Sequence, residues 1–87
     1  MKCRKTIQIY TVSDGWSLMP VYPSHRAQNV AAVVRVVSLE NGYALRVSPV
    51  GYDSADYEHD TLGGALIGAA QLFGITRDDW DDSDKLN

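Results

Sequence analysis

The chain has little cysteine: Cys3 is the only one. A disulfide within the chain and a zinc site built from several cysteines are therefore both excluded. Such low cysteine usage suits a reducing compartment, so the sequence predicts a cytoplasmic protein. Cys3 itself is interpreted as a small apolar residue near the start of a strand.

Long apolar runs are also missing. The longest one, at 30–34, is far below the roughly 20 residues that a membrane-spanning helix needs. Near the N-terminus Ile7 and Ile9 alternate with polar residues and do not form the apolar run of a signal peptide. We therefore expect a soluble protein with no membrane partner.

Acidic residues are scarce in the first 39 positions, where Asp14 is the only one among the 11 acids of the chain. Most of the eight lysines and arginines lie in that same part, so a basic half precedes an acidic half. The net charge is −3. This split bears on partners and association rates rather than on the fold.

The first half of the chain is rich in strand-forming residues. The alternation over 5–12 predicts a first strand, and Ser13, Asp14 and Gly15 form a turn signal. A second strand over 16–22 is expected at an edge of the sheet, because Pro20 lacks a backbone donor. The polar stretch 24–29 is predicted to be a loop.

A second hairpin is predicted around Asn41 and Gly42, the dipeptide that best tolerates a tight hairpin turn. Its first strand spans 30–39. With Asn41 and Gly42 as the turn residues, Arg35 and Arg46 share one face of the hairpin. The opposite face holds the apolar side chains and should be core; its members are Val34, Val36, Tyr43, Leu45 and Val47.

The second half of the chain predicts one helix. A connection over 49–60, with room for a short strand at 55–58, leads to Thr61 as N-cap and to apolar residues at helical spacing. Gly74 should end the helix. The glycines at 63, 64 and 68 each cost about 1 kcal/mol against alanine, which close approach of the helix backbone to the sheet or to another chain should offset.

The expected fold is therefore α+β, with residues 1–87 as a single domain. A four-stranded, mostly antiparallel sheet of two hairpins carries a C-terminal helix on one face, and a short acidic helix follows from Thr76 to about Asp82. Residues 83–87 should fray. The predicted core comprises Ile7, Ile9, Val34, Val36, Leu45, Val47, Leu66, Ala69 and Phe73.

Signatures of catalysis are lacking, since the chain has no Gly-x-Ser-x-Gly elbow, phosphate loop or His-Glu-x-x-His pair. We expect no enzyme and no cofactor. The acids and histidine between Asp53 and Asp60 do not have the spacing of an EF-hand loop, so no metal site is predicted. His59 is expected to be a partly exposed histidine beside the helix cap.

The corner after the helix resembles the turn of helix-turn-helix proteins, with Ala70, Gly74, Ile75 and Trp80 at the matching places. In that family the second helix meets DNA. Here four aspartates fall on that helix and would repel a phosphate backbone. We therefore expect a structural corner rather than a DNA reader.

Acids at fixed spacing, with aromatic residues among them, could instead imitate a phosphate backbone and block a basic protein. In size, acidity and aromatic content the chain resembles phage-encoded anti-CRISPR and antirestriction inhibitors. That resemblance implies an inhibitor of a nucleic-acid-handling complex, acting in the host cytoplasm. A solvated face that only confers solubility is the alternative. The expected partner-binding residues are Asp78, Asp79, Trp80, Asp81, Asp82, Asp56 and Glu58.

The basic half supports a rival hypothesis. Arg35, Arg46 and Lys5, joined by other N-terminal cations, could line one sheet face beside exposed Tyr10 and Trp16 and bind single-stranded nucleic acid. The same cations could pair with acids of this chain or of a second copy. A homodimer or another self-associating arrangement is thus a further alternative.

Overall fold

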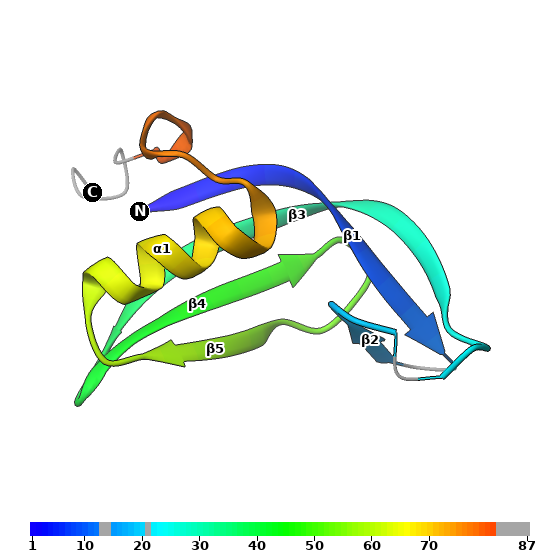
Figure 1. Cartoon of the computed structure of the whole chain (residues 1–87). Helices are drawn as coiled ribbons and strands as arrows, with labels where there is room; N and C mark the ends of the chain where they lie inside the picture. Colours follow the sequence, from blue (N-terminus) through cyan, green and yellow to red (C-terminus); the bar gives the residue numbers. More distant parts are fainter. Residues whose placement is uncertain (13–14, 21, 82–87) are drawn as a thin grey trace.

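The computed structural model describes residues 1–12, 15–20 and 22–81. Over these residues the chain forms a sheet, one α-helix and one short 3-10 helix (Figure 1). This confirms the expected α+β class. In chain order the elements are β1 (Lys2–Val12), β2 (Gly15–Ser17), β3 (Arg26–Leu39), β4 (Gly42–Pro49), β5 (Ala55–His59), α1 (Leu62–Phe73) and η1 (Arg77–Asp79).

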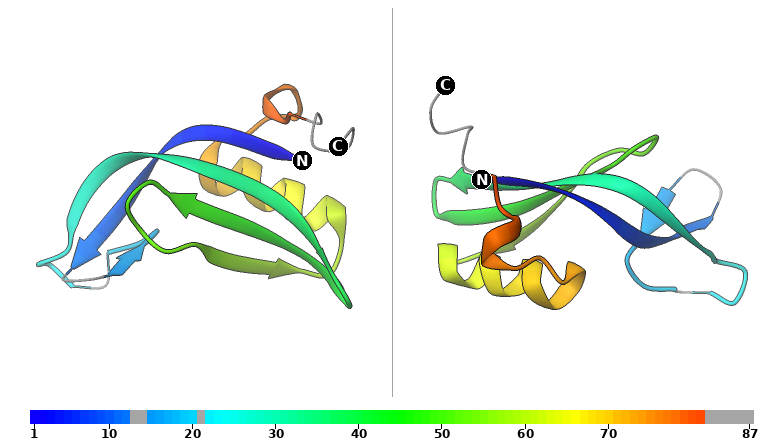
Figure 2. Two further views of the ribbon diagram at one scale, coloured as in Figure 1. Left: turned by 180° about the vertical axis from the view of Figure 1, so that it is seen from behind. Right: turned by 90° about the horizontal axis from the view of Figure 1, so that it is seen from above.

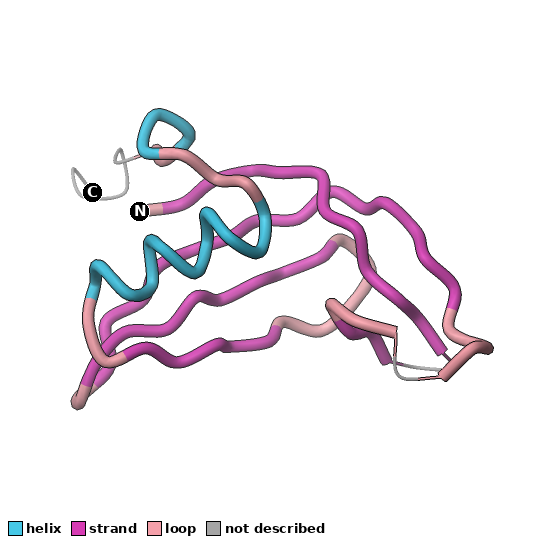
Figure 3. Tube along the Cα trace, in the orientation of Figure 1, coloured by secondary structure: helices cyan, strands magenta, loops and turns pink. Residues whose placement is uncertain are grey.

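The strands pair antiparallel in the order β2-β1-β3-β4-β5. The sheet is strongly curled, as the bending of β1 and β3 shows in Figure 2 and in the tube of Figure 3. Curling brings β2 to the connection between β4 and β5. There the Trp16 indole N–H donates a 2.7 Å hydrogen bond to the Asp53 carbonyl. The Gln28 amide donates to the Tyr52 hydroxyl and ties β3 to the same connection.

The turn between β3 and β4 differs from the predicted one. Leu39 pairs with Gly42, so Glu40 and Asn41 are the two turn residues. Gly42 was expected as a turn residue, but glycine is needed at this position because β5 lies close to its backbone. A Cβ atom at Gly42 would lie 2.5 Å from the backbone carbonyl oxygen of His59 on β5.

The predicted faces of this hairpin are nevertheless confirmed. Moving the turn by one position shifts each pair by two residues in total, and side chains alternate with a period of two, so no side chain changes face. Arg35 lies directly opposite Arg46 on one face. The other face carries the expected set of Val34, Val36, Tyr43, Leu45 and Val47.

The caps of α1 are those that the sequence predicts. The Thr61 Oγ1 atom accepts a 2.9 Å hydrogen bond from the Gly64 N–H. Gly74 ends the helix with φ 67°, a left-handed conformation that glycine adopts at no steric cost. The Ile75 N–H donates to the Ala69 carbonyl, and the Ile75 side chain is buried.

The predicted close packing of the helix glycines is confirmed at Gly68. A Cβ atom there would lie 2.9 Å from Cε1 of His59 and 3.5 Å from Cδ1 of Leu45. His59 itself is half-buried, and its buried Nε2 has no hydrogen-bond partner among the described residues. The glycine thus makes room for an imidazole ring between α1 and β5.

The core lies between α1 and one face of the sheet. Of the predicted core residues, Val36, Leu66 and Phe73 are only half-buried, and Leu66 and Phe73 each line a surface hollow. The others are buried as predicted. The buried cluster of this core comprises Cys3, Ile7, Ile9, Ala32, Val34, Leu45, Val47, Ala65, Ala69 and Ile75.

The predicted second strand is too long. The edge position of β2 is confirmed, but the strand ends at Ser17. The Ser17 hydroxyl accepts from the Met19 N–H at 3.2 Å and donates to the Met19 carbonyl at 2.9 Å. Such side-chain bonds to nearby backbone compete with the strand ladder and make a local turn. Ser13 and Asp14 of the first predicted turn lie outside the described residues.

Two further predictions need correction. The proposed loop over 24–29 is in part strand, because β3 begins at Arg26 and pairs with β1 along its whole first half. The optional short strand is real: β5 pairs with β4, so the described residues form five strands and not four. Among the described residues, no helix combines the length and the apolar composition needed to cross a membrane.

Candidate functional site

The conformation of the acidic corner, defined as residues 76–81, is stabilised by the side chain of Asp79. Asp79 Oδ2 accepts hydrogen bonds from the Thr76 backbone N–H at 2.8 Å and from the Thr76 hydroxyl at 3.1 Å. It also lies 3.7 Å from the Lys5 ammonium. The bonds from Thr76, with the nearby Lys5, hold the pKa of Asp79 below its usual value. Asp79 therefore supports the fold of the corner.

The short acidic helix predicted from Thr76 to about Asp82 is, within the described residues, only the three-residue η1. η1 contains three residues in 3-10 geometry, too few for a recognition helix. The segment therefore differs in conformation from the second helix of the helix-turn-helix family. Its end is fixed to the sheet, because Asp81 and Lys2 exchange two backbone hydrogen bonds of 3.2 and 2.7 Å.

The other predicted partner-binding residues of the corner differ in exposure. Asp78 and Asp81 are exposed, whereas Trp80 is half-buried and packs against the core. Asp82 lies outside the described residues. Asp78 and Asp81 are thus exposed on a backbone that is bonded to the sheet at Lys2.

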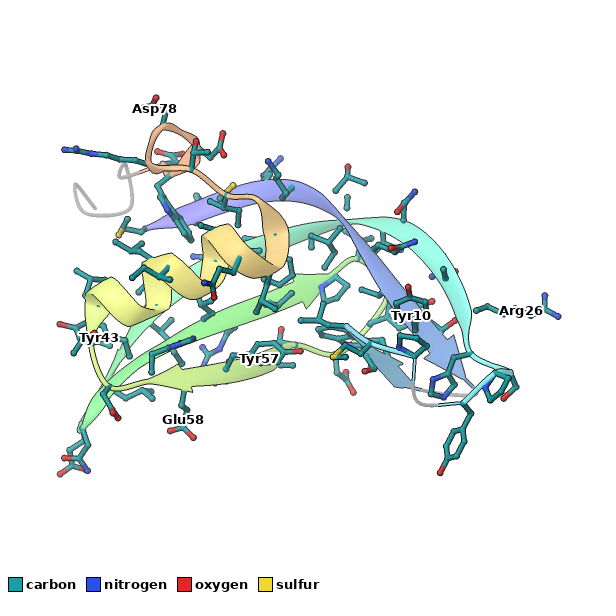
Figure 4. The ribbon with its side chains drawn as sticks, viewed as in Figure 1. Tyr10, Arg26, Tyr43, Tyr57, Glu58 and Asp78 are labelled. Carbon is teal, nitrogen blue, oxygen red and sulfur yellow. The ribbon has the colours of Figure 1, made fainter. Side chains whose placement is uncertain are left out.

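Asp56 and Glu58 lie elsewhere, on β5 at the far edge of the sheet. Figure 4 shows Glu58 and Asp78 at opposite sides of the molecule. Asp56 forms a bidentate pair with Arg46, with distances of 2.9 Å from Nε to Oδ1 and 3.0 Å from Nη2 to Oδ2. These hydrogen bonds lower the pKa of Asp56 and raise that of Arg46. The structure therefore divides the predicted acidic residues into two groups.

A row of cations crosses the face of the sheet that α1 leaves uncovered. Lys2 pairs with Arg35, Arg35 with Arg46, and Arg46 with Asp56. Paired residues on antiparallel strands point to the same face. Figure 2, in the view from above, shows α1 on the opposite side. We call Lys2, Arg35 and Arg46 the basic row; Arg4 lies two residues along β1 on the same face.

For two residues, Lys5 and Trp16, the prediction named the wrong face of the sheet. Lys5 lies on the α1 face, because side chains alternate along β1, and there it pairs with Asp79. Trp16 is half-buried and bonded to Asp53, also on the α1 side. Tyr10 does lie on the uncovered face with Thr6, because the two residues are four positions apart on β1 and side chains alternate between the faces.

Burial affects the acid–base properties of two potentially reactive side chains, Cys3 and Tyr57. Cys3 is buried, and burial raises the pKa of its thiol, so the thiolate is disfavoured. Burial also raises the pKa of Tyr57. Among the described residues, no three histidine, cysteine, aspartate or glutamate side chains lie close enough together to hold a metal ion.

The sequence reasoning missed a groove of about 500 Å³ between α1 and η1. A signal for it exists, because α1 contains no charged residue and thus has no polar outer face. Ile67, on the outer side of α1, is 60% exposed. The groove is lined by Met1, Leu66, Ile67, Ala70, Ile75, Arg77, Asp78 and Trp80.

Comparisons with models of protein families, with curated proteins and with solved structures find no match to this chain. The resemblance to phage-encoded inhibitors therefore stays an expectation from the sequence.

Proposed function

We propose that the chain is a non-enzymatic binding protein whose uncovered sheet face binds an anionic partner, most simply single-stranded RNA or DNA. The basic row is the observation that carries this proposal. Lys2, Arg35 and Arg46 occupy corresponding positions on three neighbouring strands, about 4.8 Å apart. A cationic track of this kind follows a phosphate backbone without reading its sequence.

The environment of the row supports the same reading. Arg35 and Arg46 lie directly opposite each other, and like charges at such positions destabilise a sheet. The Asp56 carboxylate already offsets part of that repulsion through its pair with Arg46, and a bound anion would add to this effect. Thr6 and Gln8, exposed on the same face, add hydrogen-bonding groups, and Tyr10 offers a ring for base stacking.

The proposal predicts binding that depends on salt. A fluorescently labelled single-stranded oligonucleotide should gain anisotropy when the protein is added at low salt and lose it as salt rises. Replacing two row residues, in the double variant Arg35→Gln and Arg46→Gln, should weaken binding at every salt concentration. The slope of log affinity against log salt should fall by about 1.4, at roughly 0.7 for each lost phosphate contact.

A matched control removes two cations away from this face. Arg26 and Arg77 are exposed, and Arg26 lies on the α1 face by its pairing with Thr11. The double variant Arg26→Gln and Arg77→Gln should keep the original salt slope. Absence of any binding at low salt, or an equal loss in both double variants, contradicts the proposal.

A second candidate function is an inhibitor that presents the acidic corner to a basic, nucleic-acid-handling protein. The anchoring of the corner favours it. The Thr76–Asp79 contacts and the Lys2–Asp81 backbone bonds fix the chain on both sides of Asp78. Carboxylates held in fixed positions lose little entropy on binding.

This candidate is tested by capture of a partner from a lysate of the native host, with the partner identified by mass spectrometry. The double variant Asp78→Asn and Asp81→Asn should lose the partner and keep its thermal stability, because Asp79 stays in place. The control Glu40→Gln and Asp53→Asn removes two exposed acids elsewhere and should retain the partner. Capture that survives the first double variant excludes this role of the corner.

A further inference from the structure

The outer edge of β1 is unpaired over most of its length among the residues that the structure describes. β3 pairs with the inner edge from Lys2 to Thr11, but on the outer edge β2 pairs only from Tyr10 onward. Asp81 occupies the same outer edge at Lys2. Between Lys2 and Tyr10, no described residue pairs with the outer edge.

The unpaired backbone groups on this edge can be assigned. Both backbone groups of Lys2 point outward, because they bond to Asp81. Outward and inward orientation alternate along a strand, so the N–H and C=O groups of Arg4, Thr6 and Gln8 also point outward. All three residues are exposed. An unpaired edge of this kind is a template for another strand.

A hollow of about 270 Å³ lies at this edge. Thr6, Ile7 and Gln8 form its floor. Its walls are apolar side chains from the segment after β2 and from the end of α1: Leu18, Met19, Leu72 and Phe73. Met19 is 72% exposed and Leu72 is 50% exposed, so these walls have apolar surface available for a ligand.

The ends of the open edge decide what can occupy it. A second copy pairing through β1 about a two-fold axis at Thr6 would place its Lys2 opposite Tyr10. That position is already taken by Ser17, and Lys2 is likewise taken by Asp81. The edge is therefore closed at both ends to a complete β1 strand, and it fits only a short extended segment.

We propose that this edge binds a short extended peptide by strand addition, with an apolar side chain opposite Ile7 and an acidic side chain opposite Arg4. The residue opposite Ile7 points to the α1 face and enters the hollow. The residue opposite Arg4 points to the uncovered face beside its guanidinium. Main-chain bonds to Arg4, Thr6 and Gln8 supply affinity, and the hollow selects the apolar side chain.

The site is tested with the full chain, labelled with nitrogen-15, and an acetylated five-residue probe, Ser-Phe-Thr-Val-Glu. In antiparallel alignment its central threonine lies opposite Thr6, its phenylalanine opposite Ile7 and its glutamate opposite Arg4. Titration should shift the amide signals of Thr6 and Gln8 and slow their hydrogen exchange. Shifts confined to other surfaces, or no shifts at millimolar peptide, overturn the proposal.

Two modified probes separate strand addition from simple apolar contact. N-methylation of the central threonine removes the N–H that donates to β1 and should weaken binding about tenfold or more. N-methylation of the phenylalanine changes an N–H that points away from β1 and should have little effect. Equal effects of the two methyl groups count against strand addition.

Variants of the protein complete the test. Thr6→Pro removes an outward donor at an edge position where proline is tolerated, and it should abolish binding. Leu72→Ser alters only the exposed wall of the hollow. It should weaken binding of the phenylalanine probe more than binding of a probe with alanine in place of phenylalanine. Binding unchanged in both variants, with the fold confirmed by the amide spectrum, overturns the site.

Discussion

At the scale of single residues, the contact between Gly68 and His59 shows how a side chain on one element dictates a residue on another. The imidazole ring lies where a Cβ atom of residue 68 would be. The free-energy cost of glycine in a helix, about 1 kcal/mol, is therefore offset by packing. Gly63, by contrast, has no heavy atom within 4 Å of the position of a Cβ atom, and nothing in the structure requires glycine there.

This contrast predicts opposite effects of the same substitution. Gly68→Ala should lower the free energy of unfolding by about 1 kcal/mol, because the cost of overpacking exceeds the gain in helix propensity. Gly63→Ala, the control, should raise it by about 0.5 kcal/mol or more. Urea unfolding of the two variants and the parent measures both changes. An equal gain in both variants would show that the His59 ring moves aside freely.

At the scale of elements, the sequence was enough to predict those features that depend only on nearby residues. The caps at Thr61 and Gly74 and the faces of the second hairpin depend on neighbours in sequence, and they were predictable. The length of β3 was not, because Arg26 enters the sheet only through pairing with β1. β2 ends early because of the bonds between Ser17 and Met19, which no residue pattern indicated.

In the candidate sites, too, features set by nearby residues were predictable, whereas features set by other segments of the chain were not. The start of the acidic corner at Thr76 was visible in the sequence, as was the shared face of Arg35 and Arg46. Their partners were not: the Arg46–Asp56 pair requires β5 next to β4, and the placement of Lys5 requires the start of β1. The open edge of β1 has no sequence signal at all, because it follows from where β2 ends.

At the scale of the whole molecule, acidic residues of the second half meet cations in two contacts, one within that half and one with the basic half. Asp56 pairs with Arg46 across the sheet, and Asp79 lies against Lys5 of the basic half. The Lys5–Asp79 contact joins segments that are distant in sequence, whereas Arg46 and Asp56 lie on consecutive strands. Protonation of these two carboxylates in acid should therefore lower the free energy of unfolding.

The pKa values of Asp56 and Asp79 are lowered in the folded protein. A lowered folded pKa contributes stability that is present above the unfolded pKa and is lost as pH falls through the folded pKa. Urea unfolding between pH 7 and pH 2.5 should therefore show a free energy of unfolding that declines below about pH 4, the usual range of aspartate. The double variant Asp56→Asn and Asp79→Asn should be less stable at pH 7 and should lose less stability in acid. The control Asp53→Asn and Asp78→Asn should keep the parent's decline, and an equally flattened profile in both double variants would assign the acid sensitivity to net charge instead of these contacts.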